Sequence, residues 1–148
     1  MFSLKNKVVV ITGGSGLLGS NFVEAILHYQ GIPIILDLSK KNMNIQKKKM
    51  FDKFNIVLDS FICDITKEKD VKNISKVILK KYKKIDCLIN NAANNHQPNS
   101  YKLNFLENFS IDQWNQDLNV GLTGAFLCSK IFGNAISKNK KGGSIIKI

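Results

Sequence analysis

Short apolar runs recur along the chain, separated by longer segments in which apolar residues are spaced more widely. The first run, VVVIT at residues 8–12, is continuous and rich in β-branched side chains. Such a run predicts a strand buried on both faces, as in a parallel sheet. The expected strands are residues 7–12, residues 32–37, a segment within 55–66, a segment within 84–93 and a last segment within 141–148.

Between these runs, apolar residues recur at the spacing of an amphipathic helix. In the first helix Gly31 is the expected stop signal, because glycine commonly follows the last helical turn. Ser110 followed by Gln113 is a capping-box pattern, which predicts the start of a long helix over residues 111–137. The expected helices are residues 17–30, 41–54, 70–82 and 111–137.

Strands that alternate with helices of ten or more residues imply right-handed crossover connections. We therefore expect an α/β fold, with helices on both faces of a doubly wound parallel sheet in the strand order 3-2-1-4-5. No repeat, low-complexity segment or second hydrophobic pattern divides the chain, so residues 1–148 are interpreted as one domain.

Composition narrows the class of protein. With 44% hydrophobic and 22% charged residues, the chain is typical of globular domains. No apolar run approaches the ~20 residues of a membrane span, and the first residues lack the order of a signal peptide. These features predict a soluble, cytoplasmic protein.

The formal net charge is +11, and all 22 basic residues are lysines. Arginine supplies the bidentate contacts that read guanine and clamp phosphate, and this chain has none. We interpret the scattered lysines as a solvated surface and expect neither a nucleic-acid partner nor a membrane partner.

Three cysteines, Cys63, Cys87 and Cys128, lie in apolar surroundings. An odd count without the spacing of metal ligands argues against both a disulfide framework and a zinc site. We expect buried, reduced thiols and no metal site.

The strongest chemical signal is GSGLLG at residues 14–19, which matches G-x-G-x-x-G between an expected strand and an expected helix. Glycines there allow a tight turn and a close approach of the backbone to a pyrophosphate, which the helix N-terminus attracts. The alternative is a glycine-rich turn selected only for its tightness. Asp37 ends the second strand, 18 residues after Gly19, and a carboxylate there favours NAD over NADP. Lys40 and Lys41 lie close enough to weaken that preference.

Together with CDIT at residues 63–66 and INNAA at residues 89–93, the segment TGGSGLLG resembles the short-chain dehydrogenase/reductase family. The resemblance implies a Rossmann-type dinucleotide-binding domain in which Asp64 accepts from the adenine amino group and Ile65 offers backbone contacts. It also implies that Asn90 braces the sheet. The cofactor-binding residues expected from the motifs are Gly13, Gly14, Ser15, Gly16, Leu17, Leu18, Gly19, Asp37, Asp64, Ile65, Asn91, Ala92 and Ala93.

The segment DLNVGLTGAFLCSK resembles the family's long central helix, which implies that Asn119 bends the helix and holds a water in the proton relay. The alternative is a buried, helix-bending asparagine without a catalytic role. His28 is expected on a helix surface, and His96 lies in a polar loop beside the expected active site. Neither histidine matches a role in the family.

The family's catalytic serine follows the fifth strand, and its catalytic tyrosine and lysine lie four residues apart on the next helix. None of the three tyrosines here, Tyr29, Tyr82 and Tyr101, has a lysine four residues later. The resemblance therefore covers the family's N-terminal part, truncated after the fifth strand.

It implies an NAD(P)-dependent oxidoreductase that transfers hydride between nicotinamide and a carbonyl or alcohol substrate. The cofactor-loop spacing and the polar residues 94–100 suggest a sugar or another polar substrate. The alternative is a non-catalytic dinucleotide-binding remnant or regulatory subunit. We also expect a homo-oligomer, because the fifth strand and the helix over residues 111–137 would expose apolar surface.

Overall fold

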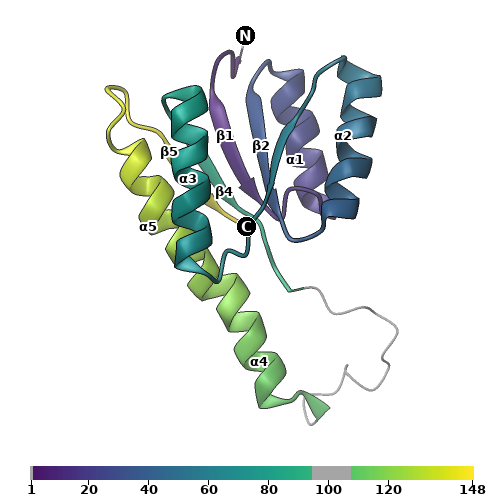
Figure 1. Cartoon of the computed structure of the whole chain (residues 1–148), viewed down its shortest axis with the longest axis vertical. Helices are drawn as coiled ribbons and strands as arrows, with labels where there is room; N and C mark the ends of the chain where they lie inside the picture. Colours follow the sequence, from purple (N-terminus) through teal and green to yellow (C-terminus); the bar gives the residue numbers. More distant parts are fainter. Residues whose placement is uncertain (1, 95–107) are drawn as a thin grey trace.

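The computed structural model describes residues 2–94 and 108–148 as one parallel sheet with helices on both faces (Figure 1). Within this part of the chain the sheet has five strands in the order β3-β2-β1-β4-β5, which confirms the predicted topology. The strands are β1 (Val8–Thr12), β2 (Ile32–Asp37), β3 (Asp59–Ile62), β4 (Cys87–Asn90) and β5 (Ser144–Lys147). The helices are α1 (Leu17–His28), α2 (Lys40–Phe54), α3 (Glu68–Tyr82), α4 (Ile111–Leu118), the π-helix η3 (Asn119–Gly124) and α5 (Ala125–Ile136).

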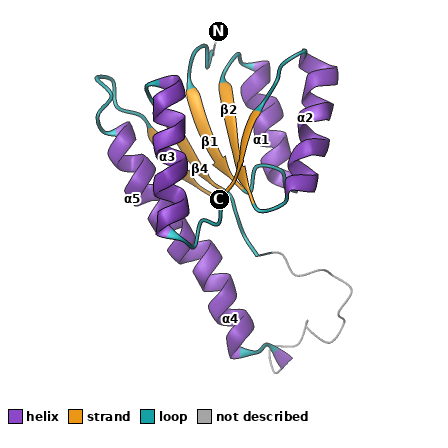
Figure 2. Cartoon of the chain, viewed as in Figure 1, coloured by secondary structure: helices purple, strands orange, loops and turns teal. Residues whose placement is uncertain are grey.

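Helices cover both faces of the sheet (Figure 2). The continuous apolar run of β1 is explained by two hydrophobic cores, one on each face. Val8 and Val10 pack into the core beneath α3 and α5, whereas Val9 and Ile11 pack into the core beneath α1 and α2. All four side chains are buried, so β1 has no face that could tolerate polar residues.

Asp86 ties together the amino ends of β1 and β4. Its carboxylate accepts the Val8 backbone N–H at 2.9 Å and pairs with Lys7 at 3.2 Å and Lys84 at 2.8 Å. Burial works to raise the pKa of Asp86, but hydrogen bonds from Lys84, the Val8 N–H and Lys7 together lower that pKa below its ordinary value. The charged form of Asp86 therefore stabilises the folded protein.

The end of α1 differs from the sequence expectation at Gly31. The left-handed residue is Gln30, with φ +65°, while the Gly31 N–H donates to the Ile26 carbonyl at 2.8 Å. A Cβ on Gly31 would lie 2.6 Å from an Ile26 methyl group and 3.1 Å from Leu4. Glycine is required here by close packing rather than by its backbone angles.

The single helix expected over residues 111–137 is instead three consecutive segments. It begins as predicted, because Ser110 Oγ accepts the Gln113 N–H at 3.2 Å, but the π-helix η3 separates α4 from α5. Figure 1 shows α4 extending beyond the body of the molecule, and α4 contains no buried residue. The buried core side chains of this stretch therefore come from α5, and Val120 of η3 packs against them.

β5 lies at the edge of the described sheet, as predicted. It pairs with β4 in register Leu88↔Ile145, and all four of its residues are exposed. Ile145 and Ile146 are 46% and 43% exposed. An apolar edge strand of this kind is a site for association with other chains.

The cysteines are free, and Cys63 and Cys128 are buried as expected, whereas Cys87 is only partly buried. Burial, together with nearby carboxylates, raises the pKa of Cys63 to about 11, and burial raises that of Cys128 to about 12. Both thiols are therefore protonated at neutral pH. Across the described residues, no helix has the length and apolar character to cross a membrane, and no three His, Cys, Asp or Glu side chains gather closely enough to hold a metal ion.

Replacing Asp86 with asparagine should lower the free energy of unfolding by about 1–2 kcal/mol at pH 7, because the charge-assisted contacts to Lys7 and Lys84 are lost. The wild-type advantage is fully present above the ordinary carboxyl pKa of about 4, and it is lost as pH falls from there through the lowered pKa of folded Asp86, where the carboxylate becomes protonated. Urea unfolding at pH 7 and at pH 3 measures both effects. The exposed Asp52 provides a matched control, and D52N should change stability by less than about 0.5 kcal/mol. Equal losses for D86N at both pH values would contradict this assignment.

Candidate dinucleotide site

The glycine loop between β1 and α1 is a tight turn held by its own backbone. Gly13 adopts φ +62°, and the Gly16 N–H donates to the Gly13 carbonyl at 3.1 Å. A Cβ on Gly19 would lie 2.2 Å from the same carbonyl oxygen, so the first turn of α1 can approach the loop only as glycine. The N-cap of α1, Gly16, provides no side-chain hydrogen bond, which leaves the helix N-terminus available to an anion.

Thr12 and Asn91 join this loop to the turn after β4. The buried Thr12 hydroxyl accepts the Asn91 N–H at 3.0 Å and the Ala92 N–H at 3.1 Å. The Asn91 side-chain amide in turn donates to the carbonyls of Thr12 and Gly13, each at 3.1 Å. The two loops therefore form one rigid unit at the carboxyl ends of β1 and β4.

Asp37, at the carboxyl end of β2, is held by three hydrogen bonds. Its Oδ2 accepts the Ser15 N–H at 3.0 Å and the Ser15 hydroxyl at 2.6 Å. Its Oδ1 accepts the Ser39 N–H at 3.1 Å. Oδ2 therefore uses both of its lone-pair sites, whereas Oδ1 retains one toward a ligand hydroxyl.

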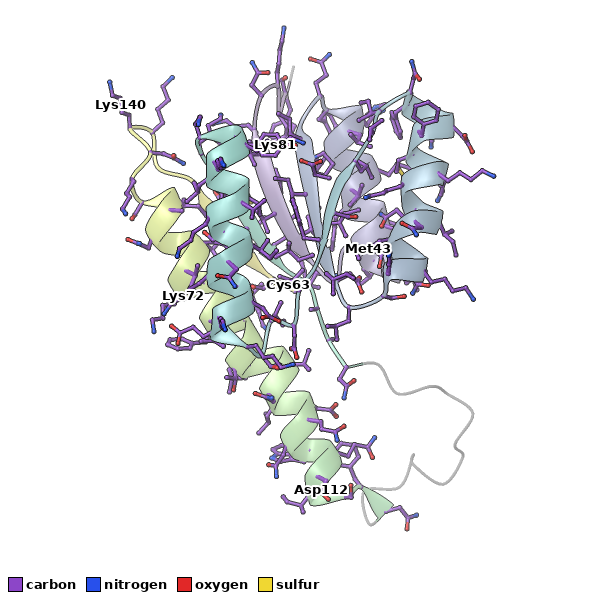
Figure 3. All side chains as sticks on the ribbon, viewed as in Figure 1. Met43, Cys63, Lys72, Lys81, Asp112 and Lys140 are labelled. Atoms are coloured by element: carbon purple, nitrogen blue, oxygen red, sulfur yellow. The ribbon has the colours of Figure 1, made fainter. Side chains whose placement is uncertain are left out.

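These loops border a cleft of about 460 Å³, within the size range of cofactor and ligand pockets. Cys63, labelled in Figure 3, lies in this region near the carboxyl ends of the strands. Nine of the predicted cofactor residues line the cleft: Gly13, Gly16, Leu17, Leu18, Asp37, Ile65, Asn91, Ala92 and Ala93. The lining residues that the sequence interpretation missed are Leu36, Leu38, Asn42, Cys63, Asn94, Val120 and Ile148.

Three predicted residues, Gly14, Ser15 and Gly19, do not line the cleft but belong to the loop and helix turn that border it. A Cβ on Gly14 would lie 3.0 Å from Ile35 of the neighbouring strand, so Gly14 allows the loop to pack on the sheet. Ser15 acts on the cleft wall through Asp37. The glycine motif is thus as much a packing requirement as a binding surface.

Asp64 does not line the cleft, although its neighbours Cys63 and Ile65 do. Its carboxylate accepts the Thr66 hydroxyl at 2.6 Å and the Thr66 N–H at 3.1 Å, and pairs with Lys67 at 3.2 Å. The hydrogen bond from the Thr66 hydroxyl lowers the pKa of Asp64, and this effect is larger than the opposing effect of burial. Lys67 lowers the pKa further. In this structure Asp64 orders the turn before α3, and its contact with adenine stays a prediction.

Asn119 begins the π-helix η3 and is exposed, so it does not have the buried position that the non-catalytic alternative expected. It lines a separate hollow with Asp112, Asn115 and Thr123, whereas its neighbour Val120 lines the cleft. π-Helical turns inside longer helices are frequent at functional sites. The catalytic role of Asn119 stays a prediction.

Asn90 donates its side-chain amide to Ser129 Oγ on α5 at 3.0 Å, so it links β4 to the helix that covers it. His28 is exposed near the end of α1, as expected. His96 and most of the polar loop around it lie outside the described residues.

Four of the missed cleft residues lie next to a predicted cofactor residue in the sequence: Leu36, Leu38, Cys63 and Asn94. Leu36 and Leu38 flank Asp37, and their position at a strand end could have been read from the sequence. Asn42 and Val120 come from helix N-terminal turns whose approach to the cleft depends on helix packing. No sequence signal marks them.

A glycine-rich turn, an acidic residue at the end of β2 and a cleft across the carboxyl ends of a parallel sheet define a dinucleotide-binding α/β protein. The sequence matches the short chain dehydrogenase family over residues 7–148. The chain belongs to this family of oxidoreductases.

Two relatives illustrate the similarity. The chain is 25% identical to an NADP-dependent mannitol dehydrogenase of Alternaria alternata over 150 residues, which cover 99% of this chain and 54% of that protein. It is 28% identical to a sorbose reductase of Candida albicans over 148 residues, covering 99% of this chain and 50% of that protein. The chain thus spans about half the length of the curated relatives that it matches.

Two solved structures are also similar to this chain. An NADPH-dependent 3-quinuclidinone reductase from Rhodotorula rubra superimposes with a TM-score of 0.79 at 28% identity, covering 99% of this chain and 53% of that one. An NAD⁺-bound xylitol dehydrogenase shares the fold with a TM-score of 0.84 at 22% identity, covering 99% of this chain and 54% of that one.

Replacing Gly19 with alanine should destabilise the protein by at least about 2 kcal/mol, because the new Cβ would overlap the Gly13 carbonyl and the Gly14 backbone. Gly121 is the matched control, since a Cβ there meets nothing within 4 Å. G121A should be neutral or stabilise by up to about 1 kcal/mol. Urea unfolding compares the two variants, and equal midpoints for G19A and wild type would show that the close approach is not required.

Proposed function

We propose that this chain is the cofactor-binding part of an NAD-dependent oxidoreductase that interconverts a polar alcohol, such as a polyol, and its carbonyl. The observation that carries the proposal is the cleft at the carboxyl ends of β1, β2 and β4, with Asp37 at the expected ribose position and small residues Ala92 and Ala93 opposite. The bound nicotinamide cofactor would supply the hydride acceptor or donor.

The chain's own residues suit an extended dinucleotide. Gly13, Gly16 and the uncapped start of α1 would receive the pyrophosphate through backbone N–H groups. Ile65, Ala92 and Ala93 would form an apolar and narrow wall for the adenosine. Asp37 would accept hydrogen bonds from the ribose hydroxyls and repel a 2′-phosphate. This last contact supports NAD rather than NADP.

The substrate class is inferred from the relatives and from the spacing of the glycine loop. The relatives include a mannitol dehydrogenase and a sorbose reductase, which act on polyols and sugars by their names. The T-G-x-x-G-x-x-G spacing from Thr12 agrees with a sugar-related substrate. Asn119 is proposed as the residue of this chain that serves the proton relay.

The second candidate is a dinucleotide-binding protein without redox activity. It is favoured by one observation, the absence from these 148 residues of any tyrosine followed by a lysine four positions later. Adding NAD⁺ and a panel of polyols to the chain and following absorbance of the reduced nicotinamide tests the second candidate. Turnover by this chain would contradict it, whereas binding without turnover is expected of both candidates, because these 148 residues contain no such tyrosine and lysine pair.

Titration calorimetry should show that the chain binds NADH at least about tenfold more tightly than NADPH, because Asp37 lies at the proposed 2′ position. D37N removes the negative charge and should bring the two dissociation constants together, mainly by tightening NADPH. D52N, an exposed acid on α2, should leave the ratio unchanged. A wild-type protein that binds both cofactors equally would contradict the proposed preference.

We propose that the chain associates with a second copy through an exposed apolar surface of its long helix. The described part of the helix from α4 to α5 exposes a row of large apolar side chains, which we name the helical apolar face: Ile111, Trp114, Leu118, Leu122 and Phe126. Leu122 and Phe126 are 64% and 61% exposed. Contiguous exposed apolar surfaces mark protein interaction sites.

Sedimentation velocity should find the wild-type chain as a dimer or larger species at micromolar concentration. The double variant L122E/F126E should shift it to monomers, because two charges would have to be buried in the contact. V57E, at an exposed apolar position before β3, is the control and should sediment like the wild type. A monomeric wild type would exclude this proposal.

A further inference from the structure

Ser15 contacts Asp37 with both of its donors. The Ser15 hydroxyl lies 2.6 Å from Asp37 Oδ2, a distance typical of a hydrogen bond to an ionised carboxylate, and the Ser15 N–H lies 3.0 Å from the same oxygen. The opposite oxygen, Oδ1, accepts the Ser39 N–H. The carboxylate is therefore fixed from the glycine loop on one side and from the start of α2 on the other.

Two backbone N–H groups at the start of α2 are already used, and neither Lys40 nor Lys41 lines the cleft. The Ser39 N–H is used by Asp37, and the Asn42 N–H donates to the Ser39 hydroxyl at 3.2 Å. A 2′-phosphate in this part of the cleft would meet Asp37 directly. Accommodating it requires the carboxylate to turn away, and that movement breaks the bonds to Ser15 and Ser39.

We propose that Ser15 is a positioning residue for cofactor specificity: its hydroxyl holds Asp37 in the orientation that accepts the ribose 2′-hydroxyl and excludes a 2′-phosphate. The inference rests on the proposed function, because it assumes that the cleft binds a nicotinamide dinucleotide. Ser15 does not itself line the cleft, so its effect passes through the carboxylate.

The backbone and side-chain contributions of Ser15 are separable. Any residue at position 15 supplies the N–H bond, but only a hydroxyl supplies the 2.6 Å bond. Removing the hydroxyl leaves Asp37 charged and present but less restrained. The change should therefore affect discrimination between NADH and NADPH more than affinity for NADH.

The experiment measures the dissociation constants of NADH and NADPH by titration calorimetry for the wild type, S15A, S15T and S20A. S15A should lower the ratio of the NADPH constant to the NADH constant by up to about tenfold, as expected for a lost hydrogen bond to a charged group. S15T keeps a hydroxyl and should restore the ratio. Ser20, on α1, donates its hydroxyl only to the nearby Leu17 carbonyl at 2.9 Å, and S20A should keep the wild-type ratio.

A double-variant cycle distinguishes positioning from direct contact with the cofactor. In the D37N background, S15A should have no further effect on the ratio, because no carboxylate remains to be positioned. A full effect of S15A in that background would overturn the inference, and so would a folded S15A protein with the wild-type ratio. If S15A does not fold, S15C, which has a similar size but a weak donor, carries the same comparison.

The proposed function and this inference fail in different ways. A folded wild-type protein that binds neither NADH nor NADPH overturns the proposed function and the inference with it. A wild type that prefers NADH and keeps this preference in S15A overturns the inference alone.

Discussion

The contact between the first turn of α1 and the loop after β1 is the constraint on which the shape of the proposed cofactor cleft depends. Gly19 must lie against the Gly13 carbonyl with no side chain between them, since a Cβ would stand 2.2 Å from that oxygen. The same loop meets the turn after β4, where a Cβ on Gly13 would lie 2.9 Å from Ala92. Three backbone segments thus meet at the carboxyl ends of the strands, and the N-terminus of α1 faces the space that they leave open.

Polar groups are concentrated at the two ends of the sheet, and each end uses them differently. At the amino end, Asp86 joins two strands and gathers Lys7 and Lys84. At the carboxyl end, Asn91 and Asp37 restrain loops while keeping acceptor capacity for a ligand. The apolar centres of the strands between these ends contribute the buried core. In open α/β sheets, ligands bind at the carboxyl ends of the strands.

Packing is uneven across the described part of the chain. Core side chains of α5 are buried, whereas α4 and the outer side of β5 expose apolar residues. Val120 reaches the cleft from the π-helix, while Asn119 lies in a separate hollow one residue earlier. Val120 and Asn119, although adjacent in the sequence, therefore face different hollows.

The sequence by itself determined the strands, the glycine loop and the place of Asp37, because hydrophobic period and glycine spacing act over a few neighbouring residues. The strand order followed from the alternation of strands and helices, because crossover connections are right-handed. It could not reveal that Ser15 binds Asp37, 22 residues away, or that Asn91 holds the Gly13 carbonyl. Nor did it indicate the π-helix at Asn119 or Gln30 as the left-handed residue near Gly31. These features arise only when separate strands and helices pack together, since each depends on a distance between elements that no local pattern encodes.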